Sequence, residues 1–309
     1  MGMLDGKVIA VTGAGRGIGR GEALLLATEG ARVVVNDLGG EWDGSGEDTR
    51  VAAQVVAEIE AAGGEAAGHF EDIGEPGGAA SLVATAIDRW GRIDGLVNNA
   101  GILRDKMVFN MAPEDWDAVI KVHLRGTFLC TAEVCRHWRE RAKAGEDVSG
   151  ARVVNTSSTS GLLGIAGQSN YGAAKSGIAS FTQIVSMEMG KYGVGVNAIA
   201  PGARTRMTEQ TFGDLKTEGE FDPLAPENIA PLVAYLCSEA AAGITGQVFG
   251  ITGGLVELYR SWTPVAELEQ DARWELSALA ERVPELFEGR KTAYEPSRSP
   301  LRRITGLGE

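Results

Sequence analysis

The chain has 309 residues, of which 44% are hydrophobic and 23% are charged, an ordinary composition for one large globular domain or two small ones. Its 42 acidic residues against 29 basic ones give a formal net charge of -13, which opposes general binding to nucleic acid or to an anionic membrane. It has no run of 18 apolar residues and no N-terminal signal segment, so we expect a soluble, cytoplasmic protein. Cys130, Cys135 and Cys237 lie in apolar helical patterns without metal-ligand spacing, which predicts buried reduced thiols and no metal site.

Short β-branched runs alternate with amphipathic stretches from residue 7 to about residue 200, a pattern typical of a parallel sheet with helices on both faces. The predicted strands are near-continuous apolar runs, which suits burial on both faces. They span residues 8–11, 32–36, 95–98, 152–155 and 194–199, and residues 246–251 would close the sheet. Two of the predicted helices span residues 48–62 and 171–191. We therefore predict an α/β fold with a single doubly wound parallel sheet of Rossmann type.

Residues 39–47 are glycine-rich, acidic and polar, which indicates an exposed loop and not a domain boundary. Beyond about residue 259, a helical stretch over residues 265–287 and a polar tail with Pro296 and Pro300 extend past the sheet. We predict one domain over residues 1–259 and a C-terminal helical extension over residues 260–309. The extension would either pack on a neighbouring subunit or be mobile.

A glycine-rich turn from Thr12 to Gly19 follows the first predicted strand, and a helical pattern follows the turn. Glycines let the backbone approach a pyrophosphate, and the next helix supplies free N–H groups and the positive end of its dipole. Tight turns also need glycine for steric reasons alone, but this order of strand, turn and helix favours nucleotide binding. The residues expected at the nucleotide are Gly13, Gly15, Arg16, Gly17, Ile18 and Gly19.

Asp37 lies at the end of the second predicted strand, 18 residues beyond Gly19. A carboxylate there accepts hydrogen bonds from the adenosine ribose and repels a 2′-phosphate, which favours NAD over NADP. Arg16 could partly offset that repulsion, and a solvated aspartate at a strand end is the alternative interpretation. Asp72 and Ile73, after the third strand, are candidates for contact with the adenine, although an acidic loop residue is usually just solvated.

Tyr171 and Lys175 are four residues apart at the start of a predicted helix, so both side chains project from one face. Hydride transfer between nicotinamide and a carbinol carbon needs a group that exchanges the hydroxyl proton, and a tyrosine of lowered pKa serves this purpose. A nearby cation favours its phenolate. Ser158, 13 residues before Tyr171, could hold the substrate oxygen, with the adjacent Ser157 as a competing assignment. These residues predict an acid/base site.

Together, these motifs resemble the short-chain dehydrogenase/reductase superfamily over roughly residues 5–256. They are Thr12 to Gly19, Asn98 to Gly101, Ser158 with Tyr171 and Lys175, and Pro201-Gly202. The resemblance implies one Rossmann-type domain, a nicotinamide cofactor and a homodimer or homotetramer. The residues that it places at the cofactor are Asn99, Ala100, Gly101, Val122, Tyr171, Lys175, Pro201, Gly202 and Thr205.

Many members of this superfamily carry an asparagine that completes a proton relay with the serine, tyrosine and lysine. The matching position here is His123. An imidazole can bond a backbone carbonyl or water as the amide would, and it can also titrate near neutral pH. A lone histidine is just as well a satisfied structural residue, so a relay role and a structural role both stay open.

Residues 33–40, 99–105 and 122–126 are similar to the (3R)-hydroxyacyl-CoA dehydrogenase part of peroxisomal multifunctional enzyme type 2, also described as a 17β-hydroxysteroid dehydrogenase. This similarity implies that NAD oxidises a 3-hydroxyacyl thioester with a fatty or sterol side chain, in lipid metabolism. No fused hydratase domain is expected. A CoA ester needs cations for its phosphates, and the candidates, each of which could equally be ordinary surface, are Arg104, Lys106, Arg204 and Arg206.

Two other functions stay open. An NADPH-dependent 3-oxoacyl carrier-protein reductase, or a hydroxysteroid or carbonyl reductase, would use the same fold, although Asp37 disfavours NADPH. A catalytically silent NAD-binding module is the more distant alternative, and the presence of Ser158, Tyr171 and Lys175 disfavours it.

Overall fold

The computed structural model describes residues 2–207 and 221–295. Within these residues, eight strands form one sheet in the order β3-β2-β1-β4-β5-β6-β7-β8. The strands are β1 (Val8–Thr12), β2 (Arg32–Asn36), β3 (Glu65–His69), β4 (Gly95–Asn98), β5 (Arg152–Thr156), β6 (Gly195–Gly202), β7 (Val248–Thr252) and β8 (Leu255–Tyr259). All neighbouring pairs are parallel except β7 with β8. The order reverses between β1 and β4, and in such sheets ligands bind at the carboxyl ends of the strands beside this switch point.

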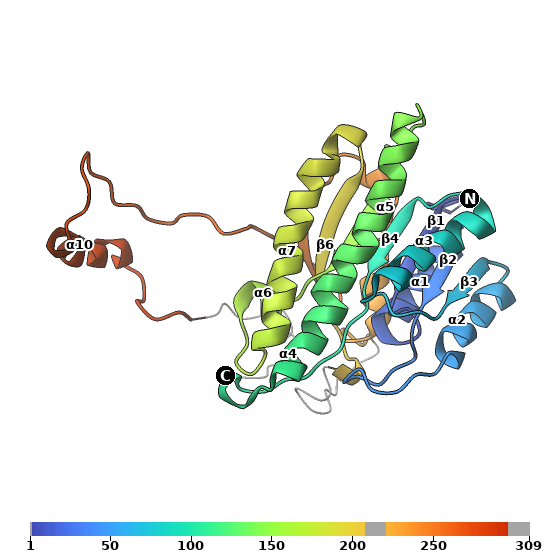
Figure 1. Cartoon of the computed structure of the whole chain (residues 1–309), viewed down its shortest axis with the longest axis horizontal. Helices are drawn as coiled ribbons and strands as arrows, with labels where there is room; N and C mark the ends of the chain where they lie inside the picture. The colour runs from blue at the N-terminus through green and yellow to red at the C-terminus, as the bar shows by residue number, and fades with distance from the viewer. Residues whose placement is uncertain (1, 208–220, 296–309) are drawn as a thin grey trace.

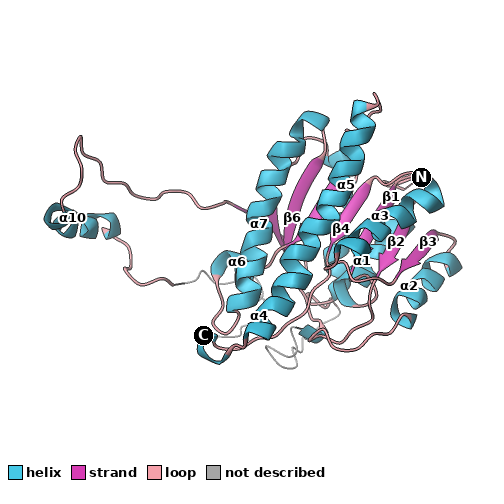
Figure 2. Cartoon of the chain, viewed as in Figure 1, coloured by secondary structure: helices cyan, strands magenta, loops and turns pink. Residues whose placement is uncertain are grey.

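Helices cover both faces of the sheet (Figures 1 and 2). The α-helices that lie wholly within the described residues are α1 (Gly17–Thr28), α2 (Arg50–Ala61), α3 (Pro76–Trp90), α4 (Pro113–Ile120), α5 (Gly126–Lys143), α6 (Thr159–Leu163), α7 (Ser169–Met189), α9 (Ala230–Cys237) and α10 (Leu276–Arg282). Helices α1, α2 and α9 share one apolar core with the sheet, and α3, α5 and α7 share the other. The prediction of a single doubly wound sheet is confirmed.

Strand β2 shows why the sequence builds this layered core. Val33 and Val35 face the core beneath α1 and α2, whereas Val34 faces the core beneath α3. Successive side chains of a strand point to opposite faces, so a strand covered on both sides needs apolar residues at every position. The unbroken valine run therefore specifies a central strand.

The prediction that residues 246–251 close the sheet is wrong, because β8 lies outside β7 as an antiparallel edge strand. Thr252 pairs with Leu255 across a turn of two glycines, and Gly253 has a φ of 56°. A left-handed backbone at this position favours glycine. The Gly253-Gly254 pair between two apolar runs was the sequence signal for this hairpin.

The C-terminal extension is less helical than predicted. Of residues 265–287, only α10 and a 3-10 turn over Val283–Phe287 are helical. In Figure 1, α10 stands away from the sheet at the end of an extended segment. None of residues 260–295 is buried, and short helices without a packing partner gain little stability, which accounts for the shortened helix. The tail prolines Pro296 and Pro300 lie outside the described residues.

The three cysteines are free thiols, with Cys130 and Cys237 buried and Cys135 half-buried. In residues 2–207 and 221–295, no cluster of His, Cys, Asp and Glu is arranged to hold a metal ion. No helix in the same part of the chain has the length and apolar character needed to cross a membrane.

Candidate active site

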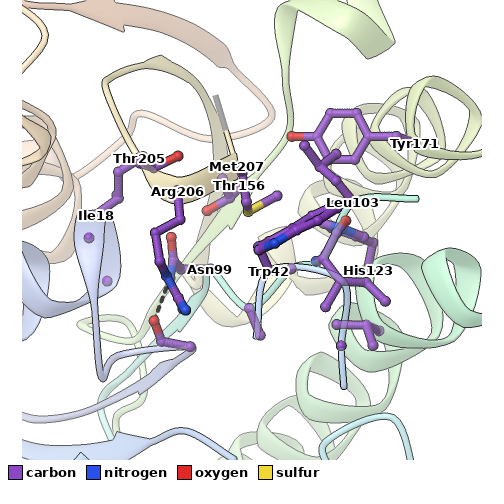
Figure 3. Close-up of a pocket in the computed structure, with 18 of the residues that line it drawn as sticks. Ile18, Trp42, Asn99, Leu103, His123, Thr156, Tyr171, Thr205, Arg206 and Met207 are labelled. Carbon is purple, nitrogen blue, oxygen red and sulfur yellow. Dashed lines mark hydrogen bonds between the residues drawn. The ribbon is translucent and has the colours of Figure 1, made fainter. Parts of the chain in front are cut away.

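A cavity of about 590 Å³ opens at the carboxyl ends of the central strands. Residues that follow β1, β2, β4, β5 and β6 all contribute to its wall. Figure 3 shows Ile18, Thr205 and Arg206 on one side of the cavity and His123 and Tyr171 on the other. The cavity therefore joins the glycine turn to the predicted acid/base residues.

The glycine turn is locked against the segment that follows β4. Gly13 has a φ of 64°, and a Cβ on it would lie 2.6 Å from the Cα of Ala100. The Asn99 side-chain amide donates to the carbonyls of Thr12 and Gly13 at 3.1 and 3.0 Å. Asn99 thus holds the turn in place, and the turn keeps the bare backbone that a pyrophosphate requires.

Asp37 is held at the cavity wall by two backbone amides. Gly15 donates to Oδ2 at 2.8 Å, and Gly39 donates to Oδ1 at 2.6 Å. A Cβ on Gly15 would lie 2.8 Å from Oδ2, so only glycine allows this approach. The two bonds fix the orientation of the carboxylate, and each oxygen keeps a second lone pair for a ligand.

The structure brings almost all the predicted cofactor residues to one cavity. Those that line it are Gly13, Arg16, Gly17, Ile18, Gly19, Asp37, Asp72, Ile73, Asn99, Ala100, Gly101, Val122, Tyr171, Lys175, Pro201, Gly202 and Thr205. Gly15 does not line the cavity, but its backbone amide donates to the Asp37 side chain, which does. Asp72 also forms an ion pair of 2.8 Å with Lys121. This cradle, with its bare glycine backbone and its oriented carboxylate, fits a dinucleotide.

The two candidate serines are in different environments. Ser157 is 1% exposed, and its hydroxyl donates to the backbone carbonyl of Lys175 at 2.8 Å. Ser158 lines the cavity and accepts a hydrogen bond from the backbone N–H of Ser160 at 3.1 Å, as the N-cap of α6. The geometry favours Ser158 as the serine that meets a ligand.

Tyr171 and Lys175 lie on the first turns of α7 and line the cavity together. The Lys175 Nζ lies 5.5 Å from the centre of the Tyr171 ring and donates to the Thr156 carbonyl at 2.6 Å. Burial raises the pKa of Tyr171 to about 12, against a hydrogen bond with Ser158 that lowers it. Burial also lowers the pKa of Lys175 to about 7. The protein groups alone therefore do not produce the lowered tyrosine pKa that the sequence predicted.

His123 is buried beneath Tyr171 in a short π-helical turn, Lys121–Arg125. Its Nε2 lies 2.8 Å from the carbonyl oxygen of Ile102 and 3.0 Å from the amide nitrogen of the same residue. The rings of His123 and Tyr171 meet edge to face, 5.1 Å between centres. Burial, and then the charge of Lys175, hold the pKa of His123 well below its ordinary value. The ring is therefore neutral near pH 7, and the titration that its residue type suggested is suppressed.

Two parts of the cavity wall were not predicted from the sequence. The loop over residues 39–47 is not wholly exposed, because Trp42 lines the cavity and its carbonyl accepts from the amide of Leu103 at 2.9 Å. Gln168 also lines the cavity, three residues before Tyr171. An aromatic residue in an otherwise polar loop was the signal for Trp42, whereas nothing local distinguished Gln168.

The four cations proposed for a CoA ester do not share one position. Arg104 and Arg206 line the cavity, and Arg206 pairs with Glu41 at 2.9 Å. Lys106 and Arg204 do not line it, and they pair with Asp115 and Asp222 respectively. Only the first two are placed to meet a ligand in the cavity.

Residues 7–216 match the model of the short chain dehydrogenase family. The chain belongs to this family. Membership implies a nicotinamide cofactor and an oxidoreductase acting on small molecules, and it confirms the resemblance read from the motifs. A crystal structure of a short chain dehydrogenase from Mycobacterium avium superposes with a TM-score of 0.85 at 47% identity, over 96% of this chain and 100% of that one.

Three curated relatives have similar identities. Hydroxyacyl-CoA dehydrogenase ChsB1 of Mycobacterium tuberculosis is 43% identical over 97% of this chain and 94% of its own length. Peroxisomal multifunctional enzyme type 2 of Mus musculus is 42% identical over 84% of this chain, which spans only 32% of that longer protein. A 3-oxoacyl-[acyl-carrier-protein] reductase of Synechocystis is 42% identical over 82% of this chain and 98% of its own length.

Proposed function

We propose that this protein oxidises the 3-hydroxyl of a (3R)-hydroxyacyl-CoA to the 3-oxo form with NAD. The observation that carries the proposal is the placement of Ser158, Tyr171 and Lys175 in one cavity with Asp37 and the glycine turn. The similarity to a hydroxyacyl-CoA dehydrogenase along almost the whole chain supports the substrate class. The acyl group is a fatty or a sterol side chain.

The roles of the side chains follow from their positions. Ser158 holds the substrate oxygen, and Tyr171 takes the hydroxyl proton. Lys175 stabilises the phenolate by its charge and orients the nicotinamide ribose. When bound, oxidised nicotinamide supplies the hydride acceptor and a positive charge beside the tyrosine. Protonated Lys175, together with that added charge, would oppose the burial that raises the pKa of Tyr171.

His123 keeps a positioning role in this proposal. Its ring contacts both Tyr171 and the backbone of Ile102, and a Cβ on Gly101 would lie 2.3 Å from its Cε1. These contacts support a ring that braces the segment after β4 against the tyrosine. A neutral buried imidazole is poorly suited to gain and lose a proton in each turnover.

Asp37 supports NAD as the cofactor, because a carboxylate fixed at the ribose end would repel a 2′-phosphate. Arg16 lies in the same wall, but its Nη1 donates to the Gly40 carbonyl at 3.3 Å and lies 4.0 Å from Glu41. These partners reduce its ability to compensate for the repulsion. The domain over residues 1–259 would carry the whole reaction, and a homodimer or homotetramer is the proposed assembly.

The second candidate function is reduction of a 3-oxoacyl group on carrier protein with NADPH, and the similarity to the Synechocystis reductase favours it. A spectrophotometric screen separates the two. We expect NADH formation from (3R)-hydroxyacyl-CoAs, tested over several chain lengths and a sterol side chain beside hydroxysteroids and simple alcohols. A preference for NADPH and a 3-oxoacyl carrier protein would contradict the proposal. NAD binding without turnover of any alcohol would instead indicate a silent module.

A further inference from the structure

The side chain of Gln168 is held from both ends in the cavity wall. It is 6% exposed and lies at the N-cap position of α7. The Ser160 hydroxyl donates to its Oε1 at 2.6 Å, and its Nε2 donates to Oδ2 of Asp105 at 2.6 Å. The amide is therefore fixed in the plane set by these two bonds.

The chemistry of Ser160 and Asp105 decides which side of the Gln168 amide is the oxygen and which is the nitrogen. An ionised carboxylate only accepts hydrogen bonds, so the NH₂ group must face Asp105. The same nitrogen carries a second hydrogen, and among the residues that the structure describes Nε2 donates no hydrogen bond other than the one to Asp105. Because Gln168 lines the same cavity as Ser158 and Tyr171, this hydrogen is a donor for a ligand there.

The backbone around Gln168 fixes its distance from Tyr171. The amide of Lys106 donates to the Gly167 carbonyl at 2.8 Å, just before Gln168. Just after it, the Asn170 side chain donates to the Arg104 carbonyl at 3.1 Å and accepts from the Tyr171 amide at 2.7 Å. The start of α7 is thus bonded to the segment after β4 on both sides of Gln168, which preorganises the amide relative to the phenol.

We propose that Gln168 donates this second N–H to the thioester carbonyl oxygen of the substrate, with Asp105 as the positioning residue that orients the amide. The inference rests on the proposed function. A 3-hydroxyacyl thioester differs from a simple secondary alcohol by a carbonyl two carbons from the reacting carbon. With the hydroxyl oxygen at Ser158 and Tyr171, Gln168 supplies a donor for that carbonyl from the wall of the same cavity, and the carboxylate of Asp105 strengthens this donor by polarising the amide.

The test compares a substrate with its carbonyl-free analogue. The substrate is the (3R)-3-hydroxyacyl-CoA that gives the highest rate in the screen above, and the analogue is the thioether in which C1 is a methylene. For the wild type we expect kcat/KM to favour the thioester by roughly 10- to 100-fold, the value of one hydrogen bond to a polarised donor. If the thioether is not turned over, its binding is measured instead, as its inhibition constant in competition with the thioester. This constant is then compared between the wild type and each variant.

Three variants test which side chain causes the preference for the thioester over the thioether. Gln168→Met keeps the length of the side chain without a donor, and it should abolish the preference while leaving thioether binding unchanged. Asp105→Asn should reduce the preference, because an asparagine can present either end of its amide to Gln168. Ser160→Ala removes the bond to Oε1 but not the donor, so it is the matched control and should retain most of the preference.

The outcomes distinguish failure of this inference from failure of the proposed function. If the wild type shows no preference for the thioester, the inference is overturned without any variant. If Gln168→Met lowers kcat/KM or binding equally for the thioester and the thioether, the residue has only a structural role, and this result would also overturn the inference. If the wild type oxidises no hydroxyacyl-CoA with NAD, the proposed function itself fails.

Discussion

Asp37 Oδ2 accepts a hydrogen bond of 2.8 Å from the backbone amide of Gly15, inside the glycine turn. The residue that follows β2 and the turn that follows β1 are thereby joined through the Asp37 side chain. The residue that discriminates between cofactors in the proposed function is therefore also hydrogen-bonded to the turn that would hold the pyrophosphate.

Replacing Asp37 by serine should change the cofactor preference. The variant loses a charged acceptor for the ribose hydroxyls and the repulsion of a 2′-phosphate, so kcat/KM with NAD should fall roughly 10- to 100-fold and the ratio of NAD to NADP rates should fall further. Steady-state kinetics with both cofactors measure this. Glu47→Ser, at an exposed position of the same loop outside the cavity wall, is the control and should not alter the ratio. An unchanged ratio in Asp37→Ser would remove Asp37 from the cofactor site.

Tyr171→Phe should lower kcat by at least about 100-fold, because the variant has no group to take the hydroxyl proton. NAD binding, measured by calorimetry, should stay within a few-fold. Tyr235→Phe removes a phenol that lies outside the cavity and should behave as the wild type. Near-normal turnover by Tyr171→Phe would refute the acid/base assignment.

Replacement of Ser157 should affect mainly stability, whereas replacement of Ser158 should affect mainly catalysis. Ser157→Ala removes the hydrogen bond that this hydroxyl donates to the Lys175 carbonyl and should lower the free energy of unfolding by roughly 0.5–1.5 kcal/mol, with kcat little changed. Ser158→Ala should lower kcat by at least about tenfold, and also cost some stability because the α6 cap is lost. Denaturant titrations and rates on the two variants give the comparison, and the reverse pattern would exchange the two roles.

His123→Asn should retain activity within about tenfold and leave the pH profile of kcat/KM unshifted. The buried ring is already neutral near pH 7, because its pKa is held well below the ordinary value, so no ionisation is lost with it. His123→Leu removes the polar contact to Ile102 and should lower the free energy of unfolding by roughly 1–3 kcal/mol. Loss of an ionisation near neutral pH in His123→Asn would show that the histidine takes part in a proton relay.

Glu22 should make the protein less stable as the pH rises. Both carboxyl oxygens of this α1 residue are buried without a hydrogen-bond partner among the described residues, and burial raises its pKa from 4.5 to about 8. Between these values the unfolded chain releases the proton and the folded chain keeps it, so stability falls as the pH rises through this window. Each unit of raised pKa corresponds to about 1.4 kcal/mol.

Glu22→Gln should therefore raise the free energy of unfolding at pH 8 by at least about 1 kcal/mol relative to the wild type, with a smaller difference at pH 5. Denaturant unfolding at both values measures this. The exposed Glu60 on α2 provides the control, and Glu60→Gln should show no such dependence. Equal effects at the two values would mean that the carboxyl is not held neutral in the folded state.

Local patterns were enough to predict most of the fold. The valine run of β2 and the order of strand, turn and helix in β1 and α1 can each be recognised from residues that lie close together in the chain. The prediction of secondary structure failed where contacts with other parts of the chain decide whether a strand or a helix forms. The strand β8 forms because a glycine turn returns the chain to β7, and α10 is short because none of its residues is buried against the sheet layers.

The sequence by itself determined the doubly wound sheet, the glycine turn, Asp37 and the pair Tyr171 and Lys175, because hydrophobic patterning, turn geometry and helical spacing are local properties of the chain. Only the tertiary structure decided which serine meets the cavity, why His123 is neutral, and that Trp42 and Gln168 belong to the wall. These depend on contacts between residues far apart in the chain, such as Gln168 with Asp105 and His123 with Ile102. Burial, which sets the pKa values of Tyr171 and Lys175, is likewise a property of the assembled layers and not of any segment.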